Sequence, residues 1–63
     1  MIIKIFKINT LELCTIYHKR QLVKFIRDEI GIYLSNNMTI NQLMKYLPVE
    51  QYYRVRWKKW MDV

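Results

Sequence analysis

Residues 2–18 carry the pattern of two strands. "IIKIFKI" (2–8) is rich in β-branched residues, and its two lysines interrupt any helical stripe. "LELCTIYH" (11–18) alternates well enough to be the second strand of a hairpin, with Asn9 and Thr10 as a two-residue turn. The alternative is that 11–18 extends the following helix, but Lys19 would then fall inside its apolar stripe. The hairpin is therefore the favoured interpretation.

From about residue 20 the hydrophobic period changes to that of a helix. The apolar residues that gather on one side are Leu22, Val23, Phe25, Ile26, Ile30, Tyr33 and Leu34. The opposite side holds Lys24, Arg27, Asp28 and Gly31. "SNNM" (35–38) consists of residues that favour turns and end the helix. We expect a long helix over about 20–34.

A second, shorter helix is predicted by "MTINQLMKYLP" (38–48). Thr39 followed three residues later by Gln42 is a capping box, in which each side chain satisfies a backbone donor of the other residue. Pro48 cannot continue a helix. We expect a helix at 40–47, whose inner stripe is Ile40, Leu43, Met44 and Leu47.

The segment "YYRVRWKK" (52–59) fits both a strand and a helix. In a strand, Tyr53, Val55 and Trp57 share a face that we expect to point inward. The outer face would then carry Tyr52, Arg54, Arg56 and Lys58, and the strand would offer residues 2–8 a partner. In a helix that begins near Pro48, the stripe is Val49, Tyr53, Trp57 and Trp60. The patterns nearly tie, so both structures stay open for about 50–60. In either case the chain is a small α+β protein.

Size and composition limit the architecture. The 63 residues form one domain, 1–63, of marginal stability, because so short a chain buries only about 60% of its unfolded surface. Cys14 and His18, the only cysteine and the only histidine, provide neither a disulfide nor a zinc site. A strand with an open edge in so small a chain favours a homodimer.

The charge balance indicates what kind of partner to expect. Eleven Lys and Arg against five Asp and Glu give a net charge of +6, which favours nucleic acid or an acidic protein surface. No segment has the pattern of a signal peptide or a membrane span, and the lone thiol suits a reducing compartment, so we expect a protein of the host cytoplasm. The basic and apolar residues do not form one long amphipathic helix, so we do not expect membrane binding. The high Ile, Lys, Asn and Tyr content is typical of an AT-rich genome, such as a phage or plasmid.

Residues 38–60 resemble the helix-turn-helix segment of phage excisionases and mercury-regulator-type repressors. The positions that match are Thr39, Leu43, Leu47, Val49, Arg56 and Trp57. Pro48 stands where that family usually has a glycine, and Arg54 stands where an apolar residue usually packs. The resemblance implies a second helix that ends near the R-W pair, and a DNA-binding regulator.

No arrangement of catalytic residues is visible, so we expect a protein that is not an enzyme and uses no cofactor or metal. Cys14 and His18 are two steps apart on a strand face, too far to touch. The densest group of basic and aromatic residues is the candidate binding site: Gln51, Tyr52, Arg54, Arg56, Lys58, Lys59 and Trp60. Basic side chains neutralise phosphates and aromatic rings stack on bases, although the same composition describes a charged outer face over a small core.

Two functions follow from this segment. The first is a small regulator that binds nucleic acid, and the alternative is an inhibitor or modulator that binds an acidic surface of a larger host protein. The geometry of 49–60 discriminates them. An exposed helix favours DNA, whereas a strand beside residues 2–8 favours the protein partner.

Overall fold

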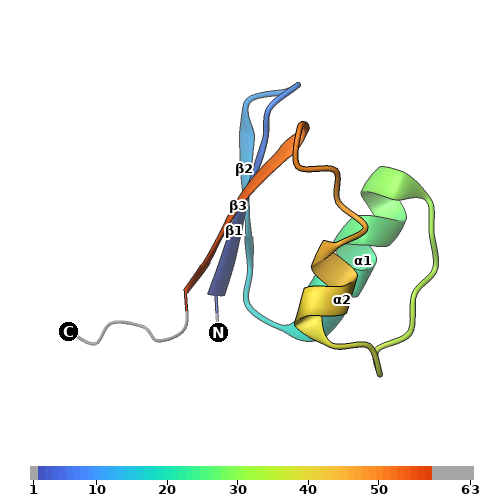
Figure 1. Cartoon of the computed structure of the whole chain (residues 1–63). Helices are drawn as coiled ribbons and strands as arrows, with labels where there is room; N and C mark the ends of the chain where they lie inside the picture. The colour runs from blue at the N-terminus through green and yellow to red at the C-terminus, as the bar shows by residue number, and fades with distance from the viewer. Residues whose placement is uncertain (1, 58–63) are drawn as a thin grey trace.

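The computed structural model describes residues 2–57, and within this range the side chains of 2–55 (Figure 1). The element order is β1 (Ile2–Lys7), β2 (Glu12–Ile16), α1 (Lys19–Ile30), α2 (Ile40–Met44) and β3 (Tyr52–Trp57). The strands form one antiparallel sheet with the order β2-β1-β3, so the first strand lies at the centre. Both helices lie on the same side of this sheet. The α+β class expected from the sequence is confirmed.

The N-terminal hairpin is confirmed, but its connection is longer than a two-residue turn. Lys7 is opposite Glu12, so residues 8–11 connect the strands. The backbone N–H of Leu11 donates to the carbonyl oxygen of Lys7 at 2.8 Å, and Leu11 has a φ of 59°. A residue in the left-handed backbone conformation therefore closes this loop. The sequence offers no glycine here to signal it.

α1 ends earlier than its apolar stripe. Gly31 adopts a left-handed φ of 86°, and its N–H donates to the carbonyl oxygen of Arg27 at 2.9 Å. Glycine adopts this conformation without the steric cost of a Cβ, so the helix stops at residue 30 rather than 34. Tyr33 is consequently exposed and lies against the Arg27 guanidinium, 5.8 Å from its ring centroid.

The capping box of α2 is confirmed. The Gln42 N–H donates to Thr39 Oγ1 at 3.1 Å, and the Thr39 N–H donates to Gln42 Oε1 at 2.9 Å. The helix ends at residue 44 rather than 47, because turn-type bonds take over, such as the one from the Leu47 N–H to the Met44 carbonyl at 3.1 Å. Leu47 remains fully buried.

The core lies between the sheet and the two helices. Its buried residues are Ile3, Ile5, Ile16, Leu22, Ile26, Leu43, Leu47 and Tyr52. The ring of Tyr52 meets that of Phe25 edge to face, with centroids 6.0 Å apart.

Residues 52–57 form a strand, and β3 pairs antiparallel with β1 from Lys7↔Tyr52 to Ile2↔Trp57. The second helix that the helix-turn-helix resemblance implies is therefore not the structure that these residues adopt. The faces of the strand are also the reverse of those expected. Tyr52 is buried, whereas Tyr53 and Val55 are exposed.

Candidate functional site

The sheet has a second face, which no described element covers (Figure 1). Because successive side chains of a strand point to opposite sides, the residues between the buried isoleucines of β1 lie on this face. The pairing places Leu13 and Tyr53 on either side of Phe6, and Thr15 and Val55 on either side of Lys4. We call this surface the outer face and define it by Ile2, Lys4, Phe6, Leu13, Thr15, Tyr53 and Val55.

The outer face is apolar and accessible. Tyr53 exposes 63% of its surface, Leu13 59% and Val55 39%, while Phe6 and Lys4 are half-buried. Apolar side chains placed side by side on a water-exposed sheet stabilise it only through cross-strand contacts of about 0.2–1 kcal/mol each. Contiguous patches of this kind mark binding surfaces more often than single exposed residues do.

Charge is distributed unevenly between the two sides of the sheet. Lys4 is the only charged residue of the outer face as defined above. The carboxylates of residues 2–57 all lie elsewhere. Asp28 is on α1 beside Lys24 and Arg27, and Glu50 lines a hollow with Asn41, Met44 and Arg54 on the helix side. Glu12 and Glu29 belong to the network described next. The outer face therefore presents a positive charge with no described acid beside it.

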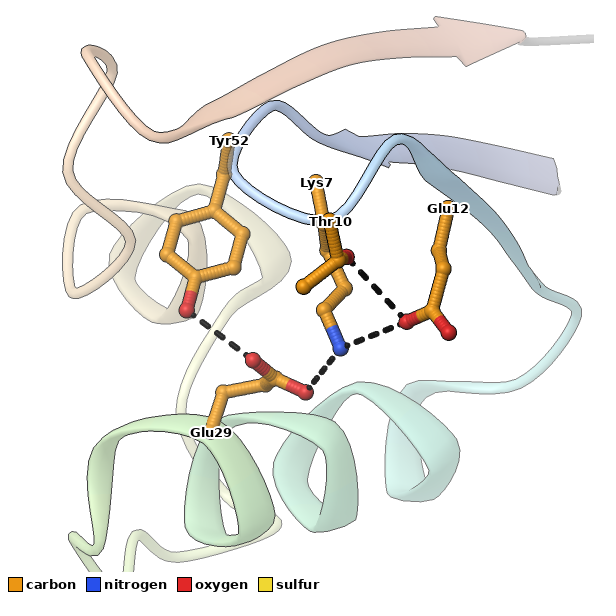
Figure 2. A network of polar contacts seen from close by, with 5 residues as sticks. All are labelled: Lys7, Thr10, Glu12, Glu29 and Tyr52. Carbon is orange, nitrogen blue, oxygen red and sulfur yellow. Dashed lines mark hydrogen bonds and ion pairs between the residues drawn. The ribbon is translucent and has the colours of Figure 1, made fainter.

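A polar network closes one end of the molecule on the helix side (Figure 2). Lys7 Nζ lies 2.8 Å from Glu29 Oε2 and 3.1 Å from Glu12 Oε1. The Tyr52 hydroxyl donates to Glu29 Oε1 at 3.0 Å, and Thr10 Oγ1 donates to Glu12 Oε1 at 3.2 Å. The network thus joins the hairpin, α1 and the start of β3.

These contacts shift three pKa values. The pKa of Lys7 is raised, first by its hydrogen bond to Glu29 and then by that to Glu12. The pKa of Glu12 is lowered, chiefly by the hydrogen bond from Lys7. The pKa of Tyr52 is raised by burial and by its bond to Glu29. Because Lys7 supplies the positive charge between the two carboxylates, we interpret the network as a structural brace.

Of the residues expected to bind a partner, the three whose side chains the structure describes do not form one open surface. Gln51 is exposed in the turn before β3, and Tyr52 belongs to the core and the brace. Arg54 points to the helix side, where Nη1 donates to the Met44 carbonyl at 2.7 Å and Nη2 to the Leu47 carbonyl at 2.6 Å. The expectation that Arg54 points outward is therefore wrong.

The remaining expected site residues fall at the limit of what the structure describes. The backbone of Arg56 pairs with Ile3, and its side chain is not described. Lys58, Lys59 and Trp60 lie outside the described residues. Trp57 was expected to point inward, and its side chain is not described either.

Sequence reasoning missed Lys4, Phe6, Leu13 and Tyr53 as surface candidates. One signal was present. "IIKIFK" carries apolar residues at both odd and even positions, whereas a two-layer protein buries only one face of a strand. The second signal would have been the position of Tyr53. It depends on which set of alternating side chains of β3 faces the core, and the pattern of "YYRVRW" left this open.

Comparison with known proteins provides no relative: no family model, no curated protein and no solved structure matches the chain. Within residues 2–57, no helix is long and apolar enough to cross a membrane. The same part of the chain contains no cluster of three or more metal-ligating side chains.

Proposed function

We propose that the protein is a small, non-enzymatic nucleic-acid-binding regulator of the cytoplasm, and that its outer face is the contact surface. The observation that carries this proposal is the pairing of Phe6 with Tyr53 beside Lys4, on a face without a described carboxylate. Aromatic rings and a cation are the groups that bind bases and phosphates. A net charge of +6 adds long-range attraction to a polyanion.

The experiment measures binding directly. Fluorescently labelled DNA and RNA, single-stranded and duplex, are titrated with the protein at low salt and then at increasing salt. We expect binding whose logarithm of affinity falls linearly with the logarithm of salt concentration, because neutralised phosphates release their counterions. No binding to any of these probes at low salt would reject the proposal.

A protein partner is the second candidate, and two observations favour it. A strand beside residues 2–8 was expected to favour a protein partner, and β3 does lie beside β1. The pairing of Phe6 with Tyr53 beside Lys4 was not part of that expectation, and it is the reason that nucleic acid stays the first candidate. Leu13 and Val55 also add aliphatic surface that a nucleic acid uses less well than a protein does. A partner of this class would combine an apolar surface with a carboxylate opposite Lys4.

Site-specific photo-crosslinking separates the two candidates. A benzophenone amino acid is placed at Tyr53 on the outer face or, as the matched control, at Tyr33, which is exposed after α1. A protein crosslinked from position 53 but not from 33, with a yield that nuclease treatment leaves unchanged, would favour the protein partner. Crosslinks that nuclease abolishes would favour nucleic acid.

A further inference from the structure

We propose that the outer face takes single-stranded nucleic acid, with unpaired bases against Phe6 and Tyr53 and a phosphate at Lys4. This inference rests on the proposed nucleic-acid function. It adds which form of the polymer binds and which side chains contact it.

The first argument is the position of the two rings. Phe6 on β1 and Tyr53 on β3 are directly opposite each other, so their side chains stand as neighbours on one face. Phe6 belongs to the central strand and Tyr53 to the neighbouring edge strand, so both rings lie on the sheet surface rather than in a loop. Bases can stack on rings placed in this way only when they are unpaired and turned out of a helix.

The second argument is what the face lacks. Reading a duplex groove requires several hydrogen-bonding side chains that reach base edges. Among the seven described residues that define the outer face, only Lys4, Thr15 and the Tyr53 hydroxyl can form such bonds, and the other four are apolar. Stacking needs only the π-face that every base has, so this surface suits single strands with little sequence preference.

The third argument is electrostatic. Lys4 lies two residues before Phe6 on the same face, between Thr15 and Val55 of the neighbouring strands. A phosphate next to a base stacked on Phe6 can therefore approach its ammonium group. The carboxylates nearest to β1 in the described chain are Glu12 and Glu29. Both pair with Lys7 on the helix side, so they do not repel a phosphate at Lys4.

The same charge argues against a second copy as the occupant of this face. Lys4 lies near the middle of the central strand, and a two-fold, face-to-face dimer would bury two such ammonium groups on faces that carry no described carboxylate. Like charges in that position are unfavourable unless an acid separates them. The face is better matched by a polymer that supplies negative charge.

The test uses three labelled probes at low salt: oligothymidylate and oligouridylate of about twenty nucleotides, which exceeds a typical single-strand site, and a DNA duplex of the same length. We expect the two single strands to bind more tightly than the duplex. Tyr53→Thr, which keeps strand propensity, should weaken single-strand binding about tenfold, the value of one lost stacked base. Tyr53→Phe should bind as the wild type does, because it keeps the ring.

The matched controls lie on the other side of the molecule. Tyr33→Thr removes an exposed tyrosine after α1 and should leave affinity unchanged.

Lys4→Gln should reduce the slope of log affinity against log salt by about 0.7, the single-strand value for one contact. Lys24→Gln, on the helix layer, should not. Backbone amide shifts on adding oligothymidylate should concentrate on β1 and β3, a result that needs no variant.

The outcomes separate the two proposals. Duplex binding equal to single-strand binding, or an unchanged affinity of Tyr53→Thr, would overturn the inference and leave the nucleic-acid function standing. Absence of binding to these three probes and to duplex RNA would overturn both. A nuclease-resistant protein crosslink from position 53 would also overturn both, in favour of the protein partner.

Discussion

The guanidinium of Arg54 donates a hydrogen bond to the main-chain carbonyl of Leu47 at 2.6 Å. Its second bond is to the carbonyl of Met44, the last residue of α2, which also accepts from the Leu47 N–H. A side chain that the sequence assigns to an outside partner thus joins β3 to the second helix.

Arg54→Gln should therefore destabilise the protein. The glutamine is shorter, and the loss of two charge-assisted bonds at a half-buried site should lower the free energy of unfolding by about 1–2 kcal/mol. Urea unfolding followed by circular dichroism measures the change. Arg20→Gln on the exposed side of α1 is the control and should stay within about 0.5 kcal/mol of the wild type. Equal stability of the two variants would show that Arg54 does not brace α2.

Thr39→Ala should lower the free energy of unfolding by about 1 kcal/mol. The substitution removes the hydroxyl that accepts from the Gln42 N–H, and an N-cap is worth that amount. For a domain of this size the melting temperature should fall by about 4–8 °C. Asn36→Ala, in the exposed turn before the cap, is the matched control. A Thr39→Ala variant that melts with the wild type would contradict the capping box.

Tyr52→Phe tests the polar brace through its pH dependence. The pKa of Tyr52 is raised above its ordinary value of 10.0, so the folded state holds the phenolic proton more tightly than the unfolded state. This contribution is complete below pH 10 and is lost as the pH rises through the raised pKa. The stability advantage of the wild type over Tyr52→Phe should therefore be constant near neutral pH and decrease in alkali.

Thermal melts of both proteins between neutral pH and the alkaline limit of folding provide the measurement. A gap between wild type and Tyr52→Phe that widens above pH 10 would have the wrong sign for the proposed linkage.

Leu11→Gly should leave stability unchanged or raise it by up to about 1 kcal/mol. Leu11 has a φ of 59° and exposes 74% of its surface, so it carries left-handed strain without compensating burial. Glycine removes the strain, although it also adds entropy to the unfolded chain. Leu13→Gly, in the neighbouring strand, should instead be destabilising. Comparable losses for both variants in urea unfolding would mean that Leu11 is not strained.

The sequence by itself determined the features that depend on residues close together along the chain. The β-branched pattern of 2–8 predicts β1, the alternation of 11–18 predicts β2, and the Thr39–Gln42 pair predicts the start of α2. In each case the signal lies within a few residues, because the hydrogen bonds and apolar faces involved are local. The two helix ends were placed too late, since apolar periodicity continues past Gly31 and Met44 while the backbone does not.

Only the tertiary structure decided which alternating side chains of β3 face the core, and therefore where the candidate site lies. Hydropathy places Tyr53 and Val55 inside, whereas the fold turns Tyr52 and Arg54 toward the helices. The interactions that decide this are made with residues outside the strand. Glu29, 23 residues earlier, accepts from the Tyr52 hydroxyl, and the carbonyls of Met44 and Leu47, 10 and 7 residues before Arg54, accept from its guanidinium. Because a strand alternates with a period of two, this one choice exposes Tyr53 beside Phe6 and creates the outer face.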